Sequence, residues 1–369
     1  MDETAQDILF NDEGCNFCSE LFILLEKQKE PKKKDIQSLV SEIKKKGKGK
    51  KYDCIVGISG GVDSSYTLLK AVELGLRPLA VHLDNGWNSE QSQNNISKLI
   101  NNLNVDLYTH VIDWDEYRKL MKSYLKANVV DFDWLVDHAV IATNMKSAKK
   151  YGVEFILTGI NLATEGIRLP KNWAWNLFDK KNLVSIAKLD EINSFLTYPT
   201  ISVLEYVYLY KIKKIKLILT LDYFDYDKNQ AIVELGKFGY KPYLYKHYDS
   251  ILTRFFQGYI LPQKFGIDKR KMFFSTLIVL GKMKRDEAIE ELKKPTYPSQ
   301  SLLVSDMEYF LKKIDWDQKK FDEYINKPGI DHNYYGSEVK LYDIIFKKQS
   351  NLKKIFNIAK YFLGNNLWK

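Results

Sequence analysis

Short apolar runs alternate with stretches of helical spacing through the first half of the chain. The runs are rich in β-branched residues and predict buried parallel strands, at Cys54–Ile58, Pro78–Leu83, Val105–Ile112 and Glu154–Thr158. The segments between them predict helices, at Tyr66–Leu74, Ser89–Asn102 and about Asp115–Tyr151. Because strands and helices alternate, we expect an α/β fold with an open parallel sheet and helices on both faces.

After about residue 222 the pattern changes, because aromatic and charged residues mix and helical spacing dominates. A clear helix is expected at Asp286–Leu292. The apolar stretch Ile201–Leu221 contains four lysines, which a membrane span would not tolerate, so it predicts an amphipathic helix or a helix–strand pair. We therefore expect three regions: a head with a lysine-rich connector at 1–50, an α/β domain at 51–225, and a mainly helical substrate or partner region at 226–369.

The positive charge of the chain is concentrated in one segment. The formal net charge is +9, and residues 27–51 hold eleven lysines against three acids, a surplus of eight. The rest of the chain is nearly neutral, so no basic groove for nucleic acid is expected. The lysine-rich segment is interpreted as a solvated linker or helix face, or alternatively as a docking segment for an acidic partner or a membrane surface.

The cysteines and the first residues indicate the compartment. Three cysteines are too few for a disulfide scaffold, so a reducing cytoplasm is the expected location. The acidic N-terminus also lacks the apolar run of a signal peptide.

The strongest chemical signal is a glycine- and serine-rich turn between the first predicted strand and the helix after it. It consists of Ser59, Gly60, Gly61, Val62, Asp63, Ser64 and Ser65. Adjacent glycines allow a tight turn, and backbone N–H groups at a helix N-terminus form an anion-binding site. The serine hydroxyls can donate to phosphate oxygens, whereas Asp63 suits a Mg²⁺ ion that bridges phosphates. A Walker A loop is excluded, because the Gly-Lys-Ser/Thr ending is absent.

This turn resembles the SGGxDS pyrophosphate loop of the N-type ATP pyrophosphatases, the PP-loop superfamily with its adenine nucleotide alpha hydrolase-like fold. The resemblance implies that region 51–225 uses ATP and Mg²⁺. A substrate oxygen would attack the α-phosphorus, and pyrophosphate would leave.

The same resemblance implies roles for residues at two other strand ends. Asp84 would lie on the adenosine side, and Gly159 and Asn161 would contact ATP. Glu165 could share Mg²⁺ with Asp63. As alternatives, Asp84 shapes a turn and Glu165 is an acid at a helix N-terminus.

Longer segments resemble the N-acetyl sugar amidotransferases of surface-polysaccharide and nonulosonic-acid biosynthesis. They are HLDNGWNSE, DHAVIATNMKSAKKYG, TGINLATEG and KHYDSILTRFFQGYILPQKFGIDKR. This resemblance implies conversion of an acetamido group on a nucleotide-linked or related sugar into an acetamidino group. Positive charge for pyrophosphate or substrate would come from Lys246, His247, Arg254, Lys269 and Arg270. His247 is also a candidate for proton transfer, and the alternative for the whole set is a solvated basic face.

The ammonia for such a reaction needs a separate source. Residue 2 is aspartate and Cys54 lies in a predicted strand, so no glutaminase nucleophile is evident. The resemblance points to a partner like the glutaminase subunit of imidazole-glycerol-phosphate synthase, in some cases with a cyclase-like companion.

Cys15 and Cys18 have zinc-knuckle spacing, but a structural Zn²⁺ site needs four ligands. By the resemblance, a second C-x-x-C pair would lie just upstream, about where this chain begins. Zn²⁺ is therefore a candidate only if such a pair completes the site. Otherwise the two cysteines are reduced and idle.

Two other functions stay open on the sequence. One is a tRNA-modifying PP-loop enzyme of the thiolase kind, which the near-neutral body of the chain disfavours. The other is an ATP-binding module without turnover, which has no need of the whole serine-glycine motif.

Overall fold

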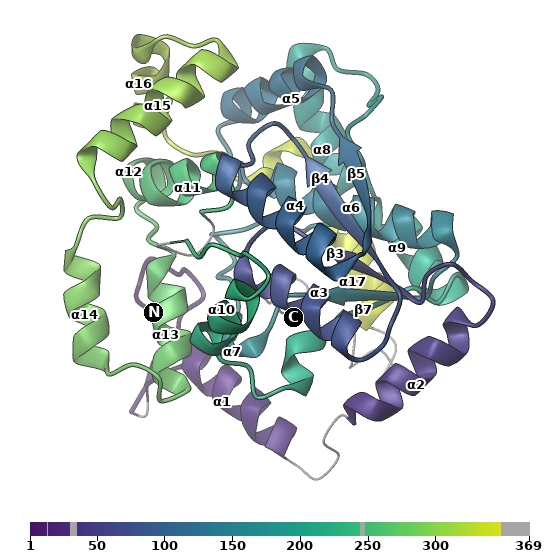
Figure 1. Cartoon of the computed structure of the whole chain (residues 1–369). Helices are drawn as coiled ribbons and strands as arrows, with labels where there is room; N and C mark the ends of the chain where they lie inside the picture. Colours follow the sequence, from purple (N-terminus) through teal and green to yellow (C-terminus); the bar gives the residue numbers. More distant parts are fainter. Residues whose placement is uncertain (13, 30–34, 244–247, 348–369) are drawn as a thin grey trace.

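The computed structural model describes residues 1–12, 14–29, 35–243 and 248–347. At its centre is a five-stranded sheet in the order β5-β4-β3-β6-β7, with all neighbouring strands parallel (Figure 1). The strands are β3 (Cys54–Gly57), β4 (Pro78–Asp84), β5 (Asp106–Val111), β6 (Phe155–Thr158) and β7 (Lys216–Leu219). The expected α/β class and the four expected strands are confirmed.

The strand order indicates where along the sheet a binding site is expected. The chain runs from β3 to β4 and β5 on one side, and then returns to β6 and β7 on the other. At such a switch point the loops after neighbouring strands diverge, and a crevice opens at the carboxyl ends of β3 and β6.

The fifth strand, β7, lies within Ile201–Leu221, the stretch for which an amphipathic helix or a helix–strand pair was expected. Helix α9 (Val203–Val207) continues into the π-helical turn η2 (Tyr208–Ile212), and β7 then pairs with β6. Lys214, between them, has a φ of 57°, so the helix is broken there. The helix–strand pair is therefore correct.

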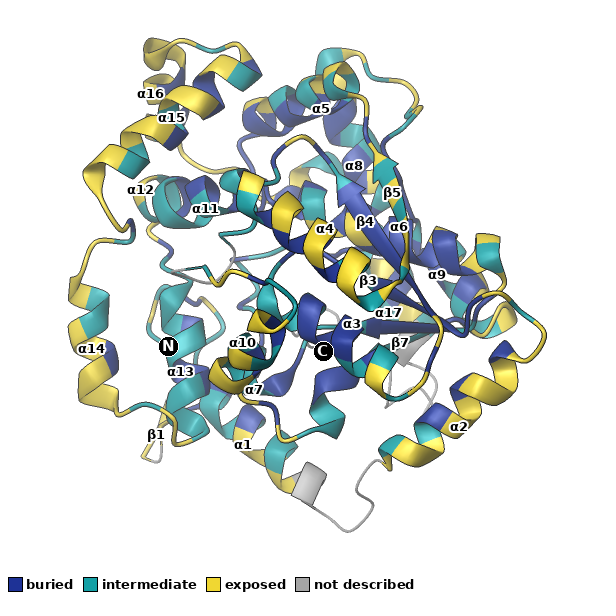
Figure 2. Cartoon of the chain, in the orientation of Figure 1, coloured by how far each residue is buried: buried dark blue, intermediate teal, exposed yellow. Residues whose placement is uncertain are grey.

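Alternate residues of the central strands enter two hydrophobic cores, one on each face of the sheet. Val56 and Leu157 belong to one core, and their neighbours Ile55 and Ile156 belong to the other. Figure 2 shows that these inner strands are buried. The first core is covered by α2 (Ile36–Gly47), α3 (Val62–Glu73), α4 (Glu90–Leu103) and α10 (Lys228–Gly236). The second is covered by α5 (Trp114–Ala127), α6 (Trp134–Tyr151), α8 (Lys180–Ala187) and α9.

The helical stretch expected at about 115–151 is divided into α5 and α6. Asn128 ends α5 with a φ of 63°, and its side chain donates to the Pro328 carbonyl at 2.9 Å. The Ile330 amide donates to the Asn128 carbonyl at 2.8 Å. The C-terminal region thus holds the break in place.

The N-terminal head is a small hairpin followed by a helix, β1 (Phe10–Asn11), β2 (Gly14–Cys15) and α1 (Asn16–Lys29). It packs on the segment that follows β6. Arg168 pairs with Asp7 and Glu20, both at 2.7 Å, and its guanidinium lies 4.0 Å from the ring centre of Phe17. Leu21 packs against Gly166.

The C-terminal region is helical, as expected. Its elements are α11 (Ile251–Phe255), η4 (Phe256–Ile260), α12 (Leu261–Phe265), α13 (Arg270–Val279), α14 (Arg285–Lys293), α15 (Gln300–Ile314), α16 (Gln318–Asn326), η5 (His332–Tyr335) and α17 (Val339–Lys347). Short elements elsewhere are α7 (Leu162–Glu165), η1 (Lys188–Asp190) and η3 (Thr220–Tyr223). None of the described helices is both long and apolar enough to cross a membrane.

Candidate active site

The serine-glycine motif forms the turn from β3 into α3. Gly61 caps α3 with extended backbone (φ −74°, ψ 161°), and no side chain caps the helix there. The N–H groups of the first helical turn therefore remain available to an anion in front of the turn. The Ser64 hydroxyl accepts from the Ser59 amide at 3.2 Å and lies 3.3 Å from the Ser59 hydroxyl, which fixes the shape of the turn.

Two glycines are required by close backbone packing around this turn. Gly60 has a φ of +81°, and a Cβ atom there would stand 2.7 Å from the Ser92 carbonyl oxygen. A Cβ atom on Gly159, directly after β6, would stand 2.6 Å from the Ser64 amide nitrogen. Gly159 was expected to let ATP approach the backbone, and the structure shows that it also lets the motif itself approach β6.

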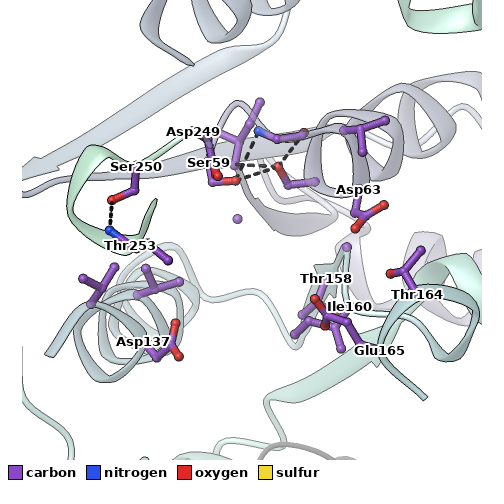
Figure 3. A pocket seen from close by; sticks show the side chains of 18 of the residues that line it. Ser59, Asp63, Asp137, Thr158, Ile160, Thr164, Glu165, Asp249, Ser250 and Thr253 are labelled. Carbon is purple, nitrogen blue, oxygen red and sulfur yellow. Dashed lines mark hydrogen bonds between the residues drawn. The ribbon is translucent and has the colours of Figure 1, made fainter. Parts of the chain in front are cut away.

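In front of the turn lies a cavity of about 430 Å³, a size common for small-molecule sites (Figure 3). The motif, the ends of β4 and β6, one face of α6 and the C-terminal region together form its wall. The sequence-predicted residues that line it are Ser59, Gly61, Val62, Asp63, Ser64, Gly159, Glu165 and Lys269. The described candidates outside its lining are Gly60, Ser65, Asp84, Asn161, Arg254 and Arg270.

Asp63 and Glu165 reach this cavity from two different helices, α3 and α7. The Tyr226 hydroxyl donates to Asp63 Oδ1 and so helps to orient that carboxylate. Mg²⁺ commonly binds through one or two carboxylates together with substrate phosphates. The two residues fit that donor set. In the described part of the chain, no three His, Cys, Asp or Glu side chains are arranged to hold a metal by themselves.

Two residues outside the lining, Asp84 and Asn161, stabilise the backbone next to the cavity. Asp84 Oδ1 accepts from the Gly86 amide at 2.9 Å and so fixes the turn after β4. Asn161 caps α7 by accepting from the Thr164 amide at 3.0 Å.

His82, at the end of β4, lines the cavity as a neutral imidazole. The Asn88 side-chain amide donates to its Nε2 at 3.1 Å, so Nδ1 carries the proton and donates to the Ile58 carbonyl at 2.9 Å. Burial lowers the pKa of His82, which agrees with this tautomer. His138, by contrast, is buried in a stack with Trp134 and Tyr198, away from the cavity.

The basic residues that were expected to act together do not all reach the cavity. Of those that the structure describes, only Lys269 lines it. Arg254 makes two hydrogen bonds to the buried Asp306, at 2.7 and 2.6 Å, which tie α11 to α15. Arg270 pairs with Asp268 at 2.8 Å and donates to carbonyls at the C-terminal end of α14. Lys246 and His247 lie outside the described residues.

Several residues that line the cavity could not be recognised from the sequence. Asp249 lies beside the motif, because the Ser59 hydroxyl bonds to its carboxylate and a Cβ atom on Gly61 would stand 3.4 Å from it. The backbone of Asp249 accepts from the Ser89 amide at 2.9 Å, which holds it next to the end of β4. Burial raises the pKa of the Asp249 carboxyl.

Helix α6 contributes a further set of polar groups to the wall. Asp137 faces the cavity (Figure 3). The Thr143 hydroxyl and Asn144 Oδ1 are buried against it and have no hydrogen-bond partner among the described residues. Buried polar atoms without partners are costly.

The cysteine pair does not form a metal site in the described residues. The Sγ atoms of Cys15 and Cys18 are 3.5 Å apart, and Cys15 directly precedes α1. Their hydrogen bond lowers the pKa of Cys15 to about 6. Zinc is therefore not supported, and the two residues remain a thiol pair.

Two segments of the chain match known families. Residues 33–156, which include the serine-glycine motif, match the NAD synthase family. Residues 249–349 match the family described as LPS biosynthesis protein WbpG-like, C-terminal domain. Together the matches support an amidotransferase-like protein of lipopolysaccharide biosynthesis in the PP-loop superfamily, in agreement with the resemblance noted in the sequence.

Solved structures give weaker similarities. The NMN synthetase from Francisella tularensis is 14% identical over 80% of this chain and 97% of its own, with a TM-score of 0.32. The NH3-dependent NAD synthetase from Campylobacter jejuni is 12% identical over 57% of this chain and 96% of its own, with a TM-score of 0.28. These scores are too low to support an argument. A comparison with curated proteins finds no match.

Proposed function

We propose that this protein is an ATP-dependent amidotransferase that converts an acetamido group of an N-acetyl sugar into an acetamidino group, releasing AMP and pyrophosphate. One observation carries the proposal: a single cavity is lined by both matched segments. The NAD synthase segment supplies the phosphate-binding turn. The WbpG-like segment supplies the facing wall, with Asp249, Thr253 and Lys269.

In the first half of the reaction, the turn after β3 holds the β- and γ-phosphates of ATP. The first-turn N–H groups of α3 and the Ser59 and Ser64 hydroxyls donate to the phosphate oxygens. Asp63 and Glu165 would hold Mg²⁺, which neutralises charge on the leaving pyrophosphate. The amide oxygen of the acetamido group attacks the α-phosphorus, and the chain's contribution is to align the two.

The acetamido sugar lies against the C-terminal wall. Thr253 and Gln257 present polar groups there, and Met272 and Phe273 present apolar surface to the cavity. Lys269 supplies positive charge to the substrate or to the pyrophosphate. In the second half, ammonia attacks the activated carbon, and AMP leaves.

The ammonia comes from a separate glutaminase subunit like that of imidazole-glycerol-phosphate synthase. None of the described cysteines suits a glutaminase nucleophile: Cys54 is buried in β3, and Cys15 and Cys18 lie in the head. The lysine-rich segment is a candidate docking surface for that partner. Removing its lysines should weaken glutamine-driven turnover more than ammonium-driven turnover, and equal loss of both would contradict docking.

The test combines ATP, Mg²⁺ and ammonium with UDP-linked, CMP-linked and free sugars that carry acetamido groups. Formation of AMP and pyrophosphate with one sugar, and replacement of its amide oxygen by NH in the mass spectrum, would support the proposal. AMP formation with transfer RNA instead would favour a tRNA-modifying enzyme.

A further inference from the structure

The first turn of α6 brings one carboxylate into the cavity that the reaction described so far does not use. Asp137 is exposed, and it lines the cavity. Figure 3 shows it below the phosphate-binding turn and across from Glu165. It therefore lies where a group bound between the phosphates and the C-terminal wall would pass.

Most carboxylates around the cavity have structural partners. Asp133 accepts from the Thr253 hydroxyl at 3.0 Å and from Gln257 Nε2 at 3.4 Å. Asp249 is bonded to Ser59, and Asp63 accepts from Tyr226. Asp137 makes no hydrogen bond or ion pair with another described residue. It is therefore free to exchange a proton with a bound molecule.

The surroundings of Asp137 favour its neutral form. The protein around it withdraws the carboxyl from bulk water, and repulsion from Asp133 and Asp131 adds to this effect. Glu165 repels it as well, and Lys269 only partly offsets these charges. The other charged groups of the cavity wall are Asp63, Asp249 and Lys228. The result is a pKa of about 8, close to what a general base needs at neutral pH.

We infer that Asp137 accepts the proton that the attacking ammonia must lose, an inference that rests on the proposed function. The nitrogen lone pair forms a bond to the activated amide carbon, and the new C–NH₃⁺ group gives one proton to the Asp137 carboxylate. The C–O bond to AMP then breaks, and its electron pair leaves on the AMP phosphate. The products are the amidinium sugar, AMP and protonated Asp137, which returns its proton to water in the cavity.

The test separates the two halves of the reaction. Adenylylation is followed by sugar-dependent exchange of labelled pyrophosphate into ATP, and amidine formation is followed by mass spectrometry with ammonium. The probe is the first sugar of the UDP- and CMP-linked panel that the wild-type protein accepts. Asp137→Asn should keep exchange within about twofold and lose about a hundredfold in amidine formation, the usual size of a general-base effect.

The controls follow from the structure. Asp286→Asn removes an exposed carboxylate from the first turn of α14, which does not line the cavity, and should change neither half. With the concentration of free NH3 held constant across the pH series, amidine formation by the wild type should rise with pH up to about 8, and this rise should be absent from Asp137→Asn.

Two results would overturn the inference. One is amidine formation by Asp137→Asn at the wild-type rate. The other is a parallel loss of exchange and amidine formation, which would assign Asp137 to substrate binding or adenylylation. If the wild type shows no pyrophosphate exchange with any sugar, the proposed function itself is contradicted. This result would be known before any variant is made.

Discussion

The backbone of Gly159 lies so close to Asp63 that a Cβ atom at position 159 would stand 2.6 Å from the Asp63 carbonyl carbon. Cβ atoms do not approach other heavy atoms this closely, so only glycine fits. The contact joins the end of β6 to the first turn of α3. It holds the serine-glycine motif and the segment from β6 to α7 in one arrangement.

Replacing this glycine should therefore disturb phosphate binding. We expect Gly159→Ala to shift the first turn of α3 and to weaken ATP binding at least tenfold, about 1.4 kcal/mol. Calorimetric titration with ATP and Mg²⁺ measures this. Gly236→Ala is the matched control, because a Cβ atom there meets nothing within 4 Å and alanine suits the C-terminal end of α10. Equal ATP affinities of wild type and Gly159→Ala would contradict the packing argument.

The carboxylate of Asp63 should be needed for turnover and not for folding. Asp63→Ala should abolish release of AMP and pyrophosphate, because the proposed Mg²⁺ loses a ligand. Tyr226→Phe removes only the hydroxyl that donates to Asp63 and should cost less, about tenfold, the order of one hydrogen bond to a charged group. Circular dichroism checks the fold. Full activity of Asp63→Ala would contradict the metal role.

Arg254 should matter for stability more than for substrate affinity. Its ion pair with Asp306 is largely buried, with exposed side-chain fractions of 12% and 6%. Arg254→Leu leaves the Asp306 charge without its partner and should lower the free energy of unfolding by about 3 kcal/mol. Lys293→Leu breaks the exposed pair with Glu290 and should change it by at most about 0.5 kcal/mol. Urea unfolding compares them, and similar values for both would refute the argument.

The turn from β3 into α3 could be predicted from sequence because its seven residues are contiguous and follow a strand. The contacts of Arg254 and Arg270 could not be predicted in this way. The partner of Arg254 is 52 residues further along the chain, and Arg270 binds carbonyls at the end of a later helix. Spacing does not reveal such long-range pairs.

Asp137 and Asp249 were missed for a related reason. Asp137 reaches the cavity because α6 packs across β3 and β4. Asp249 reaches it because its carbonyl pairs with the Ser89 amide across 160 positions of sequence. The geometry of the contiguous strand–turn–helix motif is set by its own residues, whereas the positions of Asp137 and Asp249 depend on tertiary packing.

Asp137 should also make the folding stability of the protein depend on pH. Its carboxyl keeps a proton in the folded protein up to about pH 8, whereas in the unfolded chain it releases it near its ordinary value of 3.8. Between these values unfolding releases a proton, so folding stability falls as pH rises. Asp137→Asn should therefore raise the melting temperature more at pH 8 than at pH 5. An equal shift at both pH values would show that the carboxyl titrates normally.

The most direct test of the proposed reaction is to incubate the protein with ATP, Mg²⁺, nitrogen-15-labelled ammonium and the panel of acetamido sugars. We predict that one sugar gains a single labelled nitrogen in place of its amide oxygen, with one AMP and one pyrophosphate released for each amidine formed. AMP release without labelled sugar, or labelled product with ADP and phosphate instead, would contradict the account.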